Sequence, residues 1–307
     1  MNRNFKHKVI IDCDPGSDDA IAIMLALNSE ELEILGITTC CGNAPIDLCT
    51  QNALDIINAC NRKDIPVFAG LDKPIKREIE FTDEYFGKNG LCEYEFEKSC
   101  EVAQSLNAVE FIYNCAMKED KLTIIAIAPM SNIAKALMKY PDLKEKNIEI
   151  ITMAGYYKVN HSVTTKRSEW NVLVDPEAFE IVCNSGLPMY SLGLDVTYNL
   201  KDENIYYIIE NGKKSEKMDY LIYAKDYCLK KNLWPKSLLV DALPVAFLIE
   251  RSIAKFTSGN VTIQYQDKID HNIIEFTPNE EKAKIYAAYE LDLNYFIKIL
   301  MERIFNK

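Results

Sequence analysis

Short runs of aliphatic and β-branched residues recur along this chain, and most of them are followed by a segment with helical periodicity. Runs of about four to eight such residues are typical of strands that are buried on both faces. The expected strands are Lys8–Asp12, Leu32–Thr39, Ile65–Ala69, Leu122–Ala128, Ile148–Met153 and Met189–Leu194. The expected helices are Asp18–Asn28, Ile46–Cys60, Ser131–Lys139 and one that begins near Asp175–Pro176. This alternation predicts an α/β fold with helices on both faces of a mostly parallel sheet.

The pattern changes near the C-terminus. Val261–Tyr265 and Ile273–Phe276 are expected to form a hairpin, Lys284–Leu291 a further strand, and Asp292–Ile304 an amphipathic helix. No internal repeat or Pro/Gly-rich linker interrupts the chain. We therefore expect one domain over residues 1–307, built on an open, Rossmann-like sheet with a C-terminal hairpin and helix.

Charge and cysteine content restrict the partners and the compartment. The formal net charge is -11, which disfavours nucleic acid and anionic membrane surfaces, because both attract an excess of Lys and Arg. A small neutral substrate or a cation fits this charge better. The ten cysteines form no CxxC pair, the N-terminal segment Met1–Lys8 is short and polar, and the longest apolar run is Ala20–Leu27. We expect reduced thiols and a cytoplasmic protein.

An acidic cluster follows the first expected strand. The segment 12–20 reads Asp-Cys-Asp-Pro-Gly-Ser-Asp-Asp-Ala, with four carboxylates in eight residues. Pro15–Gly16 predicts a turn, and Ser17 is a suitable N-cap for the next helix. Ligands of open α/β sheets bind at the carboxyl ends of strands.

The acids allow two interpretations. Asp18 and Asp19 could merely favour the helix N-terminus, but that does not explain Asp12 and Asp14. Crowded carboxylates raise one another's pKa unless a cation neutralises them. Oxygen ligands without a His or Cys pattern indicate Ca2+ or Mg2+ rather than zinc. A DxD after a first strand is also compatible with a haloacid-dehalogenase-type phosphatase, although Gly16 stands where such enzymes usually have Thr or Val.

Several segments resemble, in order, motifs of the inosine/uridine-type nucleoside hydrolase family of calcium-dependent N-ribohydrolases. The acidic segment is the first, and Thr-Thr-Cys-Cys-Gly-Asn at 38–43 is similar to the family's Thr-Thr-x-x-Gly-Asn. The resemblance covers nearly the whole chain. The other matching segments are Ala128–Ala134, Met153–Gly155, Glu169–Asn171, Asp175–Ala178, Gly193–Thr197 and Asp241–Ala242.

The resemblance implies hydrolysis of the N-glycosidic bond of a ribonucleoside to free base and ribose. It implies Ca2+ ligation by Asp14, Asp19, Asp241 and the carbonyl of Ile127, with Asp14 also taking the proton of the attacking water. Such an ion accepts several oxygen ligands, and carboxylates stabilise an oxocarbenium-like transition state. The residues implied in sugar binding are Asp18, Asn43, Met153, Asn160, Glu169 and Asn171.

The sequence departs from the family where the leaving base should be protonated. Val240 stands where better-known members have a His before the last metal-binding Asp, and Phe86 occupies another His region. A purine anion is a poor leaving group, so another acid is needed. The alternatives are His161, Lys231, a water chain or one of four tyrosines, Tyr156, Tyr157, Tyr223 and Tyr227. Stacking by Trp170 or Trp234 could raise the basicity of the ring.

The expected base pocket therefore comprises Phe86, His161, Tyr227, Trp234 and Val240, with Trp170 beside the substrate. A remodelled pocket predicts a non-standard base, such as the 7-deazapurine of queuosine, which lacks N7. A role in nucleoside salvage and a homodimer or homotetramer are implied by family analogy alone. Two alternatives stay open, the metal-dependent phosphatase and a catalytically weak ribose-binding sensor.

Overall fold

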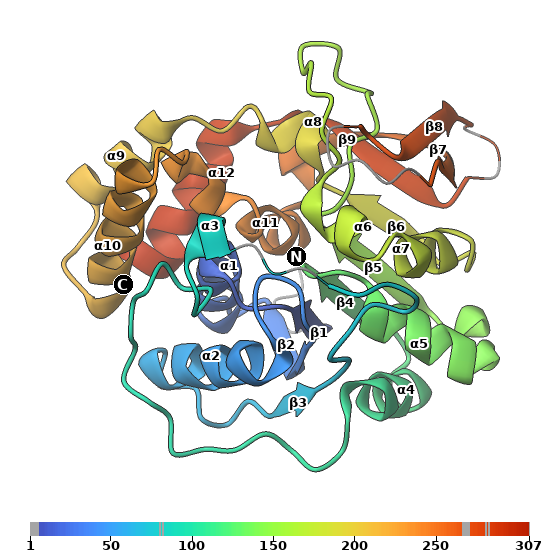
Figure 1. Ribbon diagram of the computed structural model, residues 1–307, viewed down its shortest axis with the longest axis horizontal. Coiled ribbons are helices and arrows are strands. Elements are labelled where there is room, and N and C mark those ends of the chain that lie inside the picture. Colours follow the sequence, from blue (N-terminus) through green and yellow to red (C-terminus); the bar gives the residue numbers. More distant parts are fainter. Residues whose placement is uncertain are drawn as a thin grey trace.

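Nine strands in the described part of the chain form one sheet, in the order β3-β2-β1-β4-β5-β6-β9-β7-β8 (Figure 1). The computed structural model describes residues 6–79, 81, 83–265, 271–279, 281 and 283–306, so part of the polar segment Met1–Lys8 lies outside the described residues. The strands are β1 His7–Cys13, β2 Leu32–Thr39, β3 Val67–Ala69, β4 Leu122–Ala126, β5 Ile148–Thr152, β6 Met189–Ser191, β7 Ala254–Ile263, β8 Ile274–Pro278 and β9 Ile285–Leu291.

The pairings from β3 to β9 are parallel, and at the other end of the sheet β7 pairs antiparallel with both β9 and β8. This arrangement confirms the predicted open, mostly parallel α/β sheet with a C-terminal hairpin. β7 begins at Ala254, before the predicted Val261, because its first residues pair with β9 rather than with β8.

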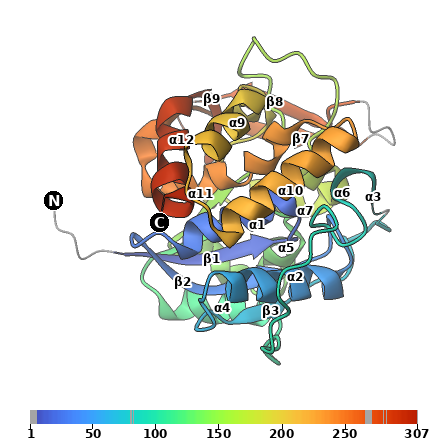
Figure 2. The same cartoon turned by 90° about the vertical axis from the view of Figure 1, so that its left-hand side faces the viewer.

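Two apolar clusters lie on opposite faces of the sheet. Side chains alternate along a strand, so Val9 and Ile11 of β1 join one cluster and Ile10 joins the other. The first face is covered by α1 Ser17–Leu27, α2 Ile46–Ala59, α11 Ala242–Ile249 and α12 Leu293–Leu300, with α9 Asp202–Asn211 and α10 Glu216–Lys230 packed on the same side (Figures 1 and 2). The second face is covered by α4 Ala108–Lys118, α5 Ser131–Lys139 and α7 Pro176–Cys183.

Short helical segments connect these elements. They are α3 Asp83–Phe86, α6 Trp170–Val174, α8 Leu194–Thr197, the 3-10 turns η1 Pro141–Glu145, η2 Pro235–Leu239 and η3 Arg251–Ile253, and the π-helical η4 Met301–Phe305. The predicted C-terminal helix is therefore α12 continued by η4. In the part of the chain that the structure describes, no helix combines the length and the apolar character that a membrane span needs.

The start of α1 corrects one prediction. Gly16, not Ser17, is the N-cap residue, and Ser17 already belongs to the helix. The Ser17 hydroxyl instead contacts the carbonyl of Gly90 at 3.4 Å and the sulfur of Cys92 at 3.1 Å. The N-terminal amide of Gly16 donates to the Asp19 carboxylate at 2.9 Å. An acid of the cluster therefore performs part of the capping expected from the serine.

The strand order indicates which edge of the sheet can bind a ligand. The chain adds β2 and β3 on one side of β1 and then returns to add β4 on the other side. Open α/β sheets bind ligands in the crevice at such a reversal, outside the carboxyl ends of the strands. The segment after β1 and the segment after β4 meet there, and these contain the acidic cluster and Ile127.

Candidate active site

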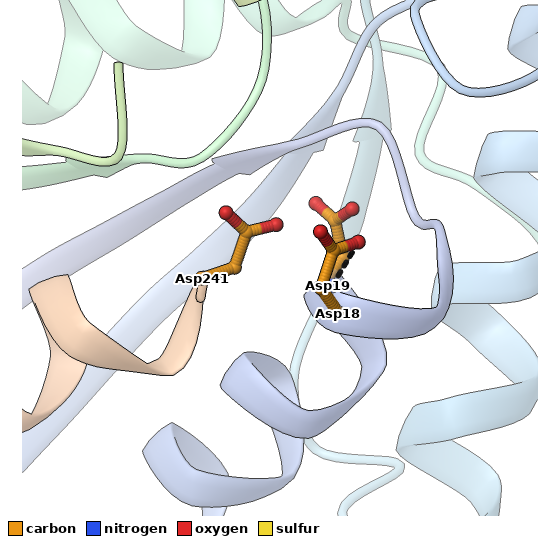
Figure 3. A group of neighbouring side chains, drawn as sticks. All are labelled: Asp18, Asp19 and Asp241. Atoms are coloured by element: carbon orange, nitrogen blue, oxygen red, sulfur yellow. Dashed lines mark hydrogen bonds between the residues drawn. The ribbon is translucent and has the colours of Figure 1, made fainter. Parts of the chain in front are cut away.

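Three carboxylates from two distant parts of the chain meet at this edge. Asp18 and Asp19 lie in the first turn of α1, and Asp241 is the N-cap residue of α11. Each contributes one oxygen to a group whose members all lie within 4.8 Å of one another. Figure 3 shows Asp241 pointing from α11 toward the other two side chains. The packing of α1 against α11 thus creates a concentrated negative site.

Asp14 lies beside this group and is fully buried. Its Oδ2 accepts a hydrogen bond from the backbone amide of Asn43 at 2.5 Å, whereas its Oδ1 has no hydrogen-bond partner among the described residues. The Asn43 side chain donates to Asp19 Oδ2 at 3.1 Å. A Cβ atom on Gly42 would lie 1.9 Å from Asp14 Oδ2, so this loop can approach the acid only with glycine at position 42.

Burial and mutual repulsion set the protonation of the cluster. Burial is the main cause that raises the pKa of Asp18 to about 7. Burial, reinforced by the neighbouring carboxylates, also raises the pKa values of Asp14, Asp19 and Asp241 well above their usual range. Among the described residues, no Lys or Arg forms an ion pair with any of these acids.

These residues fit a divalent cation. The unpartnered oxygen of Asp14 and the three clustered carboxylates are hard oxygen donors, which Ca2+ and Mg2+ prefer. Nearby thiols point elsewhere, since Cys13 contacts the carbonyl of Thr38 at 3.5 Å and Cys49 that of Ala44 at 3.2 Å. The donor set therefore disfavours a thiolate-bound zinc.

A cavity of about 420 Å³ opens over the acids. Asp18 and Asp241 line it, as do Ile127, predicted as a metal ligand through its carbonyl, and most residues that the sequence predicted to contact the sugar or the base. These are Asn43, Phe86, Ile127, Met153, Glu169, Trp170, Asn171, Trp234 and Val240. Segments from both halves of the chain thus meet around one space of the size that a small ligand occupies.

Glu169 and Asn171 are buried and fixed by backbone groups. The Glu169 carboxylate accepts from the amides of Gly155 at 2.9 Å and Asn171 at 2.7 Å. The Asn171 side-chain amide donates to the carbonyls of Met153 at 3.0 Å and Ile127 at 3.3 Å. These bonds connect the start of α6 to the ends of β4 and β5, so both polar side chains have defined positions on the cavity wall.

Three of the residues predicted to contact the sugar or the base do not line this cavity. The Asn160 side chain donates to the carbonyl of Asp195 at 2.8 Å and accepts from Ser162, which holds it within its own loop. His161 instead lines a separate pocket beside β7 and β8. Tyr227 lies on α10 with the Lys231 ammonium 5.7 Å from its ring centroid.

The other suggested acids also lie outside the lining. The Tyr156 hydroxyl donates to the carbonyl of Val163 at 2.7 Å, and that of Tyr223 contacts the carbonyl of Glu93 at 3.5 Å. Tyr157 packs in the cluster on the second face of the sheet. A loop position or an aromatic ring in the sequence gives no information on which wall it faces.

Several lining residues were not predicted. They are Tyr85, Arg167, Ser168, Leu173, Leu194, Thr197, Tyr198, Asn232, Leu233, Lys236 and Ser237. Most come from short connections without periodicity, and only their proximity to Trp170, Trp234 and the Gly193–Thr197 motif could have indicated them.

Some acids of the matching motifs have structural roles instead. Asp12 accepts from Thr38 Oγ1 at 2.6 Å and from the Asn132 amide at 2.8 Å, which connects β1 to β2 and α5. Asp175 caps α7, with the amide of Ala178 at 3.0 Å. The Asp195 carboxylate accepts from three backbone amides of the 157–160 loop. These residues maintain the loops around the site rather than line it.

The fold and the site together define an α/β enzyme that acts on a small molecule beside a group of acids able to hold a metal ion. The chain belongs to the inosine-uridine preferring nucleoside hydrolase family, whose model matches residues 9–298. It is therefore an N-glycosyl hydrolase of ribonucleosides, as the motifs implied. The alternative of a haloacid-dehalogenase-type phosphatase is not favoured by this match.

Similar proteins extend over the same length. Pyrimidine-specific ribonucleoside hydrolase RihA of Escherichia coli O9:H4 (strain HS) is 32% identical over 313 residues, covering 96% of this chain and 97% of the relative. An uncharacterized protein of Schizosaccharomyces pombe is 37% identical over 318 residues, covering 97% and 98%. The solved structure of a purine-preferring ribonucleoside hydrolase from Gardnerella vaginalis has a TM-score of 0.84 and 27% identity, covering 97% and 98%.

Proposed function

We propose that this nucleoside hydrolase works with Ca2+ held by the acidic cluster. The observation that supports this most directly is that carboxylate oxygens of Asp18, Asp19 and Asp241 lie within 4.8 Å of one another. Asp14, Asp19, Asp241 and the carbonyl of Ile127 would hold the ion. When bound, Ca2+ supplies a Lewis acid that acidifies water and accepts further oxygen ligands. Asp18, which lines the cavity, would face the sugar.

The chain's own residues supply the remaining chemistry. Asp14 is fully buried with one unpartnered oxygen, so it can accept a proton from the attacking water. Positive charge develops on the sugar ring as the C1′–N bond breaks, and the surrounding carboxylates stabilise it. Glu169 and Asn171, fixed by their backbone hydrogen bonds, would orient the hydroxyls.

Recognition of the sugar predicts strong discrimination against 2′-deoxyribonucleosides. A deoxy substrate leaves buried polar partners of the 2′-hydroxyl unpaired, and such losses cost about 1–3 kcal/mol or more. We expect kcat/KM for a 2′-deoxyribonucleoside to be about a hundredfold lower than for the matching ribonucleoside. Release of reducing sugar from both substrates measures this, and equal rates would remove Asp18, Asn43 and Asn171 from sugar binding.

The base-binding wall is aromatic and apolar. Phe86, Trp170, Tyr198 and Trp234 line it, and Val240 adds an aliphatic surface. The names of similar proteins do not indicate one kind of base, because one is pyrimidine-specific and another purine-preferring. We propose a non-standard base, with a 7-deazapurine ribonucleoside such as queuosine as the candidate, since Val240 offers no proton for N7.

A panel of ribonucleosides tests this function. Inosine, uridine, cytidine, adenosine, 7-deazaguanosine and queuosine are incubated with Ca2+ or with EGTA, and released ribose is measured. We expect ribose release that EGTA abolishes and Ca2+ restores, with a 7-deazapurine among the best substrates. Strong preference for inosine or uridine would contradict the base, and EGTA-insensitive turnover would contradict the ion. A weak ribose-binding sensor would bind ribose but release none.

We also propose that residues 1–307 act as one catalytic domain in cytoplasmic nucleoside salvage, as a homodimer or homotetramer. Two observations support the single domain and the reducing compartment, whereas salvage and the oligomer rest on family analogy. Both apolar clusters pack on one sheet, and all ten cysteines are free thiols, as in a reducing compartment.

A further inference from the structure

Lys236 lines the cavity, and its ammonium lies beside two aromatic residues of the same lining. Its Nζ donates to the carbonyl of Tyr198 at 3.3 Å and lies 5.5 Å from the centroid of that ring. The Trp234 ring centroid is 5.4 Å from the same Nζ. The backbone amide of Lys236 donates to Asp202 Oδ1 at 2.9 Å, which anchors η2 at the start of α9. The ammonium is therefore held by two aromatic rings and one hydrogen bond, on a segment that a second hydrogen bond anchors.

This ammonium has no acidic partner among the described residues, in any of the ion pairs found there. A lysine ammonium has three N–H groups, and only one of them is used by the Tyr198 carbonyl. Two protons are therefore available to a ligand in the cavity. Cations beside aromatic faces are stabilised there without a carboxylate, and a planar base in the cavity would offer a further such face.

Lys236 is also close in sequence to Val240, the position where a general acid for the leaving base was expected. Val240 and Asp241 follow it within five residues, and all three line the cavity. Val240 has no proton to give, and the suggested tyrosines do not line this space. Arg167 is the other cationic side chain in the lining, but a guanidinium does not lose its proton in proteins. Lys236 is thus the lining cation that can act as a general acid.

We propose that Lys236 is a catalytic residue that protonates the departing base, an assignment that rests on the proposed use of this cavity for the nucleoside. As the C1′–N bond breaks, its electron pair passes to the base, and a proton from Lys236 Nζ binds the base heteroatom where that charge collects. Water adds to C1′ and gives its proton to a carboxylate of the cluster. The carboxylate then releases its proton to solvent and solvent returns one to Lys236, so the enzyme is restored and the products are ribose and neutral base.

The test compares two leaving groups in one enzyme. Lys236→Met removes the proton and keeps the length of the side chain, and Lys230→Met makes the same change on the exposed end of α10. Inosine, uridine and 7-deazaguanosine need protonation of the base, whereas 4-nitrophenyl β-D-ribofuranoside releases a stable phenolate without it. We expect Lys236→Met to lower kcat/KM for the ribonucleosides about a hundredfold, as general acids contribute roughly 10²–10⁴-fold.

With the nitrophenyl riboside, the same variant should stay within about threefold of the wild-type enzyme, because no general acid is required. Lys230→Met should match the wild type on every substrate. Lys236→Arg should remain impaired on ribonucleosides, since it keeps the charge but holds its proton. Lys236→Gln serves if the methionine variant does not fold.

Two results would overturn the assignment. An equal loss on both kinds of substrate would make Lys236 a support of the cavity wall, and no loss on either would remove it from the reaction. The nitrophenyl riboside also separates this proposal from the function on which it rests. If the wild-type enzyme cleaves neither the riboside nor any ribonucleoside, the proposed use of the cavity fails, whatever Lys236 does.

Discussion

Replacing Asp241 with asparagine is expected to lower kcat/KM for ribonucleoside hydrolysis about a thousandfold, while raising the Tm of the metal-free protein. The substitution keeps the shape of the side chain but removes one of three carboxylates that meet within 4.8 Å. A catalytic metal ion contributes several kcal/mol to transition-state stabilisation, and about 4 kcal/mol corresponds to a thousandfold in rate. Ligand loss should therefore abolish most turnover.

Stability should change in the opposite direction. Asp241 is 3% exposed, and the neighbouring carboxylates of Asp18, Asp19 and Asp14 add to burial in raising its pKa. Without a cation, a neutral asparagine removes this repulsion and the desolvation of one charge. Opposite effects on activity and on metal-free stability are the signature of an acid retained for function.

Asp12→Asn is the matched control for Asp241→Asn. Asp12 is also fully buried, but its Oδ1 is held by Thr38 and Asn132, which an asparagine oxygen can still accept. This variant should keep kcat/KM within about tenfold, because buried neutral hydrogen bonds contribute roughly 1 kcal/mol each. Steady-state kinetics and thermal denaturation with EGTA measure both variants. Equal losses in the two would mean that the clustered acids have no special role.

The local pattern of apolar residues was sufficient to predict the strands whose carboxyl ends form the site. The predicted Leu32–Thr39 strand and Ser131–Lys139 helix have the bounds of β2 and α5. Buried strands are mostly continuous apolar runs here, so their position and length can be predicted without tertiary information. The location of the acids after β1 in the site was also predictable, because the carboxyl end of a central strand is a ligand-binding position in open α/β sheets.

The base-binding wall could not be predicted in the same way. Tyr198 and Lys236 come from connections that have no periodic pattern, and their side chains meet only because η2 packs beside α9 and α10. His161 and Asn160 look equally polar and loop-bound in the sequence, yet Asp195 holds their loop away from this cavity. Which side of a loop faces a ligand depends on long-range contacts that one sequence does not display.

The metal-free protein is expected to lose stability as the pH rises from 5 to 8, and Ca2+ should remove this dependence. Burial raises the pKa of Asp18 to about 7 from the usual 3.8, and it shifts Asp14, Asp19 and Asp241 in the same direction. Between the two pKa values the native state binds more protons than the unfolded chain. This stabilisation is complete below pH 4 and is lost as the pH rises through 7.

The size of the effect follows from the same values. For Asp18, the difference between 3.8 and about 7 corresponds to about 4 kcal/mol above pH 7, at roughly 1.36 kcal/mol per pKa unit. Between pH 5 and pH 8 roughly 2.7 kcal/mol of this is lost, because only the interval from 5 to about 7 is crossed. At about 2 °C per kcal/mol for a chain of this size, the metal-free Tm should fall by roughly 5 °C over this range. A bound cation favours the ionised carboxylates, so the Tm measured with excess Ca2+ should stay nearly constant.

Thermal denaturation at pH 5, 6, 7 and 8, with EGTA, Ca2+ or Mg2+, measures this dependence. Burial also raises the pKa of Asp12 to about 6, although its carboxylate is bound by Thr38 and Asn132 rather than by the cluster. Scans in the Asp12→Asn background therefore isolate the cluster, and Asp241→Asn should flatten the metal-free slope because one repelling carboxylate is gone. A metal-free Tm that rises with pH, or one that Ca2+ leaves unchanged at pH 8, would show that these acids do not form a cation site. A larger stabilisation by Mg2+ than by Ca2+ would instead reassign the ion, because Mg2+ requires a stricter octahedral arrangement of oxygens.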